Sequence, residues 1–210
     1  MPVDDITRQR ILEVAQEHFL RLGFSKVTME EIATQLGISK KTLYVYFPSK
    51  EELLSEVMTT MQNGISTTID AILNETSLDF VEKVRRMMVH GGMFHSKFSS
   101  HFWVDMQKNC PTVWRGCDDF RIMRMRANTL KIVNEGMESG FFRKDINPQI
   151  AVLIYTAAIQ QLMTPEMLSQ LPVTMQELFE TIIKIVFEGI LTDEARTKHL
   201  PTLIQHQSEK

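Results

Sequence analysis

The sequence predicts an all-α protein of about nine helices, and three observations support this. Apolar residues recur at the three- and four-residue spacing of amphipathic helices along most of the 210 residues, whereas the strict alternation of half-buried strands is scarce. There are only nine glycines, and the breaks between apolar stretches carry helix-capping signatures. With 43% hydrophobic and 23% charged residues, the composition is that of a globular chain able to bury a sizeable core.

The first two helices are delimited by their caps. Apolar residues on one face predict a helix from about Asp4 to Leu22, and Gly23 follows where a left-handed C-cap is wanted. A second helix starts at a capping box, in which the Thr28 hydroxyl caps the helix and the Glu31 side chain reaches back. Gly37 ends this helix.

A third, short helix completes the N-terminal part. Ser39 is its predicted N-cap, the helix covers Lys40 to Phe47, and Pro48 ends it. Two helices joined by a short glycine-containing turn form a helix-turn-helix pattern. Residues 39–50 contain three lysines and no acid, although the whole chain has a net charge of -3. This local basic edge is suited to contact with phosphate groups.

Ser49 and Glu52 form another capping box, which opens a long fourth helix reaching about Asn74. Further breaks separate the rest of the chain into helices, and Asn147-Pro148 and Thr174 mark two of their starts. The five further helices are expected at about 78–97, 100–107, 112–139, 148–163 and 174–191.

Several classes of protein are not expected. No apolar run approaches the roughly 18 residues of a membrane span, and the polar N-terminus has no secretion signal, so we expect a cytoplasmic protein. Cys110 and Cys117 fit a reducing compartment. His90, His95 and His101 lack the spacing of metal ligands, and no catalytic motif is present. We therefore expect no metal, no cofactor, no membrane partner and no enzymatic activity.

The stretch "FSKVTMEEIATQLGISKKTLYVYFPSKEEL", residues 24–53, resembles the DNA-binding region of the TetR family of bacterial transcriptional regulators. The family pattern has a threonine opening the second helix, an "IA…LG(V/I)S" turn and then "TLYxYFxSKEEL", all matched here at fixed spacing. One departure is Lys41, where the family often has a small residue. The resemblance implies a helix-turn-helix DNA-binding domain at 1–50 and a larger helical effector-binding and dimerisation domain at 51–210.

A recognition helix directs its N-terminal residues at base edges in the major groove, and helix starts attract phosphates. Leu43 and Phe47, four residues apart, are assigned to the core of the small domain. Together with the resemblance, this predicts the following DNA-binding residues: Thr28, Ser39, Lys40, Lys41, Thr42, Tyr44, Tyr46 and Lys50.

The two helices at about 148–163 and 174–191 are apolar over most of their circumference, which indicates burial on more than one side. They resemble the pair that forms a four-helix dimer interface in the family. The predicted interface residues of a homodimer are Ala151, Ile154, Ala158, Leu162, Leu178, Ile182, Ile185, Val186 and Gly189.

Fourteen methionines are a high number for this length, and methionine adapts to irregular apolar shapes. Most of the methionine and aromatic side chains belong to the core, but the resemblance implies that some line a site for a small hydrophobic or amphipathic effector. The candidates are Met61, Ile65, Phe94, Phe98, Phe102, Trp103, Met106, Trp114 and Met123.

The function implied is that of a dimeric, ligand-responsive regulator, a repressor that binds a palindromic double-stranded operator and associates with the nucleoid when bound. Two alternatives stay open at this point. One is an activator, or a repressor whose ligand promotes binding; the other is a carrier of lipophilic ligands without DNA function.

Overall fold

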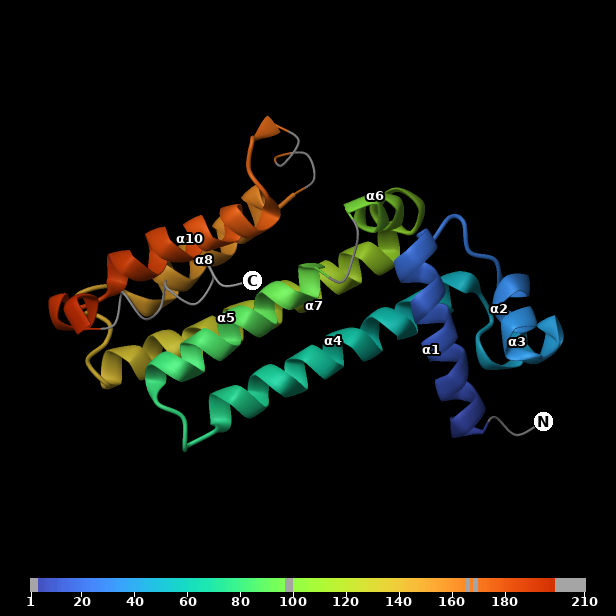
Figure 1. Ribbon diagram of the computed structural model, residues 1–210, viewed down its shortest axis with the longest axis horizontal. Coiled ribbons are helices and arrows are strands. Elements are labelled where there is room, and N and C mark those ends of the chain that lie inside the picture. Colours follow the sequence, from blue (N-terminus) through green and yellow to red (C-terminus); the bar gives the residue numbers. More distant parts are fainter. Residues whose placement is uncertain (1–3, 97–99, 165–166, 168–169, 199–210) are drawn as a thin grey trace. The chain divides into compact units, whose positions relative to one another are not determined.

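The computed structural model describes residues 4–96, 100–164, 167 and 170–198 (Figure 1). The all-α prediction is confirmed, and each of the nine expected helices is present. Among the described residues, β-type pairing is limited to an isolated antiparallel bridge between Phe142 and Leu191. The helix bounds are α1 Asp5–Leu22, α2 Met29–Leu36, α3 Lys40–Tyr46, α4 Lys50–Asn74, α5 Phe80–Ser96, α6 Ser100–Asn109, α7 Pro111–Glu138, α8 Pro148–Leu162 and α10 Met175–Ile190. Residues 193–198 are helical as well.

The predicted caps explain where these helices begin. Thr28 and Thr174 each form a complete capping box, with Glu31 and Glu177 respectively. Asn147 caps α8 by accepting hydrogen bonds from two backbone N–H groups. Pro148 occupies the first turn, where a backbone N–H would have no partner within the helix, so its missing N–H costs no hydrogen bond. Since such side chains satisfy backbone donors that the helix itself leaves unpaired, they fix the starts of helices locally.

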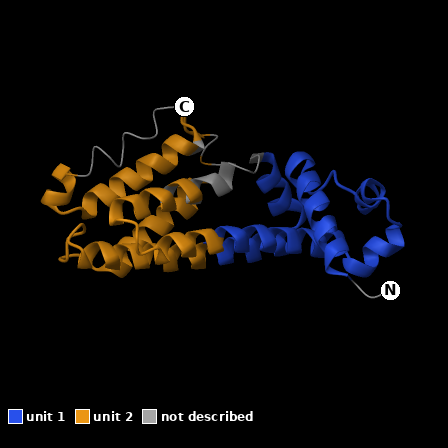
Figure 2. Cartoon of the chain, turned by 60° about the horizontal axis from the view of Figure 1, so that its bottom comes forward, with its two compact units in different colours: residues 1–65, 94–121 blue, residues 66–93, 122–210 orange. Residues whose placement is uncertain are grey.

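Residues 1–65 and 94–121 form one compact unit, and residues 66–93 and 122–210 form a second (Figure 2). The helices α4, α5 and α7 each contribute to both units. These units do not coincide with the functional division expected at residue 50, which stays a prediction.

The first unit has a continuous apolar core. Ile11, Ala15 and Phe19 of α1 pack with Ile32 of α2 and Leu43 of α3, all of them nearly or fully inaccessible to water. The core continues through α4 and α6 with Leu53, Leu54, Val57, Met58, Phe102 and Met106. Burial of this apolar surface stabilises the arrangement of the helix-turn-helix on its supporting helices.

In the second unit, aromatic side chains fill the space where α7 ends. The Phe142 ring lies edge-on to Phe80, with 5.4 Å between ring centroids, and also contacts Phe187. Gly136 of α7 is required here, since a Cβ atom at this position would come within 2.2 Å of the Phe142 ring. In the same unit, the buried Lys83 ammonium donates to the Glu135 carboxylate at 2.7 Å.

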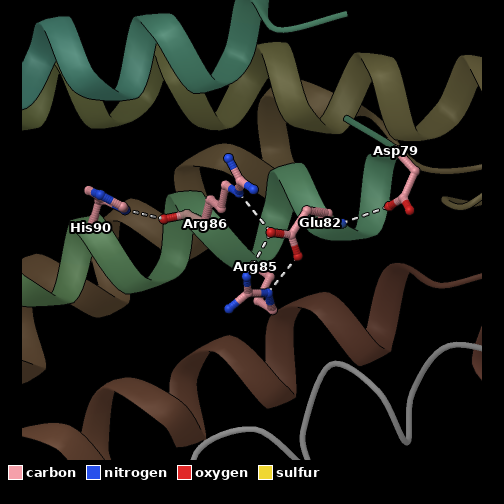
Figure 3. Close-up of polar contacts among 5 residues, drawn as sticks. All are labelled: Asp79, Glu82, Arg85, Arg86 and His90. Carbon is pink, nitrogen blue, oxygen red and sulfur yellow. Dashed lines mark hydrogen bonds and ion pairs between the residues drawn. The ribbon is translucent and has the colours of Figure 1, made fainter. Parts of the chain in front are cut away.

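The start of α5, in the same unit, is held by charge-assisted contacts (Figure 3). The Asp79 carboxylate accepts a hydrogen bond from the Glu82 N–H at 2.8 Å. The Glu82 carboxylate in turn accepts from both Arg85 and Arg86, and these bonds lower its pKa to about 2.

None of the described helices combines the length and the apolar character that crossing a bilayer requires.

Candidate nucleic-acid interface and effector site

The turn between α2 and α3 is set by glycine. Gly37 adopts φ 68° and ψ 27°, the left-handed conformation that glycine adopts without strain, and its N–H donates back to the end of α2. The Ile38 N–H donates to the Ala33 carbonyl at 3.0 Å. Ser39 then caps α3 by accepting from the Thr42 N–H at 3.0 Å. The two helices are therefore joined in a fixed geometry by three residues, as the sequence predicts.

The two faces of α3 have different characters. Leu43 is fully buried and Phe47, directly after the helix, is nearly so, which confirms the prediction that both belong to the core. On the other face, Lys40, Lys41 and Tyr44 are exposed. A short helix thus presents cationic and aromatic side chains on a surface that its apolar residues hold in place.

Two of the predicted DNA-binding residues, Lys40 and Tyr46, have acidic neighbours. The Lys40 ammonium lies 3.6 Å from the Glu30 carboxylate of α2. The half-buried Tyr46 directs its hydroxyl at Asp4, the N-cap of α1, with an O–O distance of 2.9 Å. Hydrogen bonds from the Thr7 backbone and then from Tyr46 lower the pKa of Asp4 and stabilise its ionised carboxylate.

Thr28 lies exposed at the start of α2. Its hydroxyl donates a hydrogen bond to the Glu31 carboxylate and accepts one from the Glu31 backbone N–H. The Thr28 hydrogen bonds lower the pKa of the Glu31 carboxyl. The negative charge of Glu31 therefore sits beside the same helix start that is predicted to contact a phosphate.

Lys50, at the first residue of α4, is not a freely solvated lysine. Its ammonium donates to the carbonyls of Phe24 and Val27, both at 3.0 Å, and lies 4.1 Å from the centroid of the Phe24 ring. Two of its three N–H groups are thus used within the protein. This structural role was not anticipated from the sequence.

Residues 11–57 match the model of bacterial regulatory proteins, tetR family. The chain is 30% identical over 186 residues to YvaF of Bacillus subtilis, described as an uncharacterized HTH-type transcriptional regulator, covering 89% of this chain and 96% of that protein. The chain belongs to the TetR family. It is accordingly a transcriptional regulator with a DNA-binding helix-turn-helix.

Two further proteins are similar to this chain. The chain is 25% identical over 149 residues to KstR2 of Mycobacterium tuberculosis, an HTH-type transcriptional repressor, covering 67% of this chain and 71% of that one. The structure of SmeT in complex with triclosan has the same fold, with a TM-score of 0.68 and 16% identity, covering 91% of this chain and 94% of that one.

The predicted effector residues of this TetR-family chain do not form one described site. Phe102 and Met106 lie in the core of the first unit, while Met61, Ile65, Trp103 and Trp114 pack partly buried against it. Met123 belongs to the second unit, where its side chain is exposed. Phe98 lies outside the described residues, and of Phe94 only the backbone, in α5, is described.

The first unit contains a cavity of about 290 Å³ between α4 and α7, and none of the predicted effector residues lines it. Its walls carry hydroxyl and amide groups with a few apolar side chains: Ser55, Thr59, Gln62, Asn63, Thr112, Val113, Gly116, Cys117 and Phe120. Gln62 is itself held by a hydrogen bond to the Cys117 carbonyl at 2.7 Å. Sequence periodicity gave no signal for this cavity because polar lining residues look like solvent-facing ones.

Of the predicted dimer residues, those facing the interior of the second unit are buried: Ala151, Leu178 and Ile182. Ala158, Leu162 and Val186 are half-buried, and Gly189 is exposed. Ile154 and Ile185 are 57% and 69% exposed. Ile150 and Leu153 are exposed as well, so α8 and the neighbouring α10 each contribute exposed apolar side chains to the surface of the second unit.

Neither cysteine is activated. Burial raises the pKa of Cys110, and burial raises that of Cys117 to about 11, so both thiols are protonated and weakly nucleophilic at neutral pH.

Within the described part of the chain, no three His, Cys, Asp or Glu side chains are grouped in a way that suits a metal ion. The His90 ring pairs with the Arg86 carbonyl of its own helix (Figure 3).

Proposed function

We propose that this protein is a homodimeric, cytoplasmic repressor that binds a palindromic operator and is released from it by a small amphipathic effector. The observation that carries the proposal is the division of α3 into two faces. Leu43 and the adjoining Phe47 are buried, whereas Lys40, Lys41 and Tyr44 remain exposed at the end of a rigid turn, with Val45 beside them. A surface of this kind suits base edges in the major groove, with phosphates at its border.

Within this proposal, the DNA-binding residues have distinct roles. Lys41 and Tyr44 face the base edges together with Ser39 and Thr42 at the helix start. Thr28, Lys40, Tyr46 and Lys50 lie around them and border the phosphates. Of these, Lys50 retains one N–H group for a phosphate after its two bonds to the protein.

A dimer is supported by the apolar surface of α8 and α10. Exposed isoleucines and leucines gathered on neighbouring helices are costly in water and favour burial against a second copy. Two-fold symmetry would place two recognition helices on half-sites about 34–36 Å apart, one turn of DNA. Repression follows if the occupied operator overlaps a promoter, where the bound protein is associated with the nucleoid.

For the effector, the mixed lining of the cavity in the first unit favours a molecule with both apolar and hydrogen-bonding groups. The predicted aromatic and methionine residues supply further apolar surface. The complex of SmeT with triclosan is an example of a small ligand in a protein of this fold. An effector that binds the released state more tightly by about 1–3 kcal/mol is sufficient for a useful switch.

The test begins with selection of genomic fragments bound by the protein, followed by fluorescence anisotropy with the recovered sequence. We expect a palindrome, and we expect Lys41→Ala to weaken its binding while Lys108→Ala, at an exposed lysine of α6, leaves it unchanged. Screening small molecules for release then identifies the effector. Ligands that tighten binding would instead indicate a corepressed regulator or an activator, and absence of salt-dependent DNA binding would contradict the proposal.

A further inference from the structure

The turn between α1 and α2, residues 23–28, is held by a buried carboxylate from α6. The Asp105 carboxylate accepts a hydrogen bond from the Ser25 N–H at 2.8 Å and a second from the Ser25 hydroxyl. Asn109, one helical turn further along α6, donates to Asp105 at 2.7 Å and to the Ser25 hydroxyl at 2.9 Å. Residues 80 positions apart in the sequence are thus joined by a closed polar network.

The same turn is held by a cation from α4. The Lys50 ammonium bonds the carbonyls of Phe24 and Val27, which lie on either side of Ser25 and Lys26. Hydrogen bonds to charged groups are stronger than those between neutral groups. The turn is therefore held from two helices. The Asp105 carboxylate of α6 accepts from a backbone N–H of the turn, and the Lys50 ammonium of α4 donates to two of its backbone carbonyls.

The network is built for an ionised carboxylate. Asp105 is only 7% exposed, so burial opposes its ionisation, but the hydrogen bonds from Ser25 and Asn109 prevail and lower its pKa. Gly23 allows the close approach of α6, since a Cβ atom there would lie 2.8 Å from the Asp105 carboxylate, and its φ is +86°. Removal of a donor would leave the buried charge of Asp105 less well satisfied.

We propose that Asp105 and Lys50 are positioning residues that set the placement of the helix-turn-helix, and hence operator affinity, through this turn. The turn ends at Thr28, the N-cap of α2, so a shift of the turn moves α2 and the α3 that follows it. Because α6 holds the turn at Ser25 and α4 holds it at Phe24 and Val27, movement of either helix reaches the DNA-binding surface. This inference rests on the proposed function as an operator-binding regulator.

The test compares three single variants of the whole chain. Asp105→Asn and Ser25→Ala weaken the contact with α6, and Lys50→Met removes the contact with α4 while retaining most of the aliphatic stem. Matched controls are Asp119→Asn and Lys108→Met, which make the same charge changes at exposed positions of α7 and α6. Amide hydrogen exchange of residues 23–28 is measured in the free protein, alongside thermal unfolding.

We expect the exchange rate of the backbone amide at position 25 to increase about tenfold in Asp105→Asn, Ser25→Ala and Lys50→Met, and operator affinity to fall by a similar factor. The slope of log K against log salt concentration should stay unchanged in Asp105→Asn and Ser25→Ala, because no phosphate contact is lost. In Lys50→Met, a decrease of about one in the magnitude of this slope would measure the phosphate contact that Lys50 makes in addition. The controls should match the wild type in all measurements.

Faster exchange or a lower melting temperature with unchanged operator affinity would overturn the inference, because the network would then be only structural. Unchanged exchange in Asp105→Asn and Ser25→Ala would overturn it as well. If Asp105→Asn does not fold, Ser25→Ala still decides the outcome, because it removes no group that is predicted to contact DNA. A wild-type protein that binds no operator would refute the proposed function and with it the effect on affinity, while the exchange measurement would still report whether the contacts hold the turn.

Discussion

The Tyr46 hydroxyl donates a hydrogen bond of 2.9 Å to the carboxylate of Asp4, and the Asp4 N–H lies 3.4 Å from the same oxygen. The contact joins the last turn of α3 to the N-cap of α1, across 42 positions of sequence. It also places an anion beside a residue predicted to contact a phosphate. A phosphate approaching Tyr46 would therefore be repelled by the charge of Asp4. It would also compete with the Asp4 carboxylate for the hydrogen bond that the Tyr46 hydroxyl donates.

Asp4→Asn is accordingly expected to raise operator affinity by roughly fivefold at low salt, because the repulsion between the Asp4 carboxylate and a nearby phosphate is removed. Asparagine is as good an N-cap as aspartate, so α1 should keep its start. Asp5→Asn, the same charge change at the neighbouring exposed residue, is the control. Equal affinities of the two variants in an anisotropy titration would show that the position of Asp4 next to Tyr46 has no effect.

Thr28→Ala and Thr174→Ala remove equivalent capping boxes from α2 and α10. Each should lower the free energy of unfolding by about 1 kcal/mol, as measured by urea denaturation. Only Thr28→Ala should also weaken operator binding, since only its helix start is predicted to meet DNA. The prediction fails if the two variants, equally destabilised, bind the operator equally well.

Ile154→Glu and Ile185→Glu place a charge on the apolar surface of α8 and α10. Because a dimer would bury this charge without a partner, we expect both variants to sediment as monomers in analytical ultracentrifugation and to bind the operator more weakly. Ile6→Glu, at a position of α1 that is 77% exposed, should leave the dimer intact. Retention of the dimer mass by both surface variants would contradict the proposed interface.

The Glu82 carboxyl makes a pH-dependent contribution to stability. Hydrogen bonds from Arg85 and then Arg86 lower its pKa from 4.5 to about 2 in the folded state. The contribution is therefore present above pH 4.5 and is lost as the pH falls toward 2. Glu82→Gln, which cannot titrate, should lose less stability between pH 5 and pH 3 than the wild type, as measured by urea midpoints. An identical pH dependence of the two proteins would refute this.

The helices and their caps could be predicted because they depend on neighbours in the sequence. Thr28 and Glu31 are three residues apart, as are Thr174 and Glu177, and each pair forms its capping box as expected. The burial of Leu43 and Phe47 also follows from spacing, since they share one face of a short helix. The glycine turn at Gly37 needed only its two flanking helices to be recognised.

The environment of the site residues could not be predicted in the same way. Lys50 and Tyr46 appeared in the sequence as free DNA contacts, but in the structure they bond to Phe24, Val27 and Asp4. Asp105 carried no signal at all, because an acid on an amphipathic helix is most often a solvated residue. The cavity between α4 and α7 was missed for a related reason, since its hydroxyl and amide groups have no distinctive spacing.

The sequence by itself thus determined the all-α fold, the helix-turn-helix and its membership of the TetR family, because capping, periodicity and turn chemistry act within a few residues. Tertiary structure alone decided which charges are engaged within the protein and which remain on the surface. The reason is physical: the partner of Lys50 lies 26 residues away and that of Asp105 lies 80 residues away. Such contacts exist only once the packing of α1, α4 and α6 has brought their backbones together.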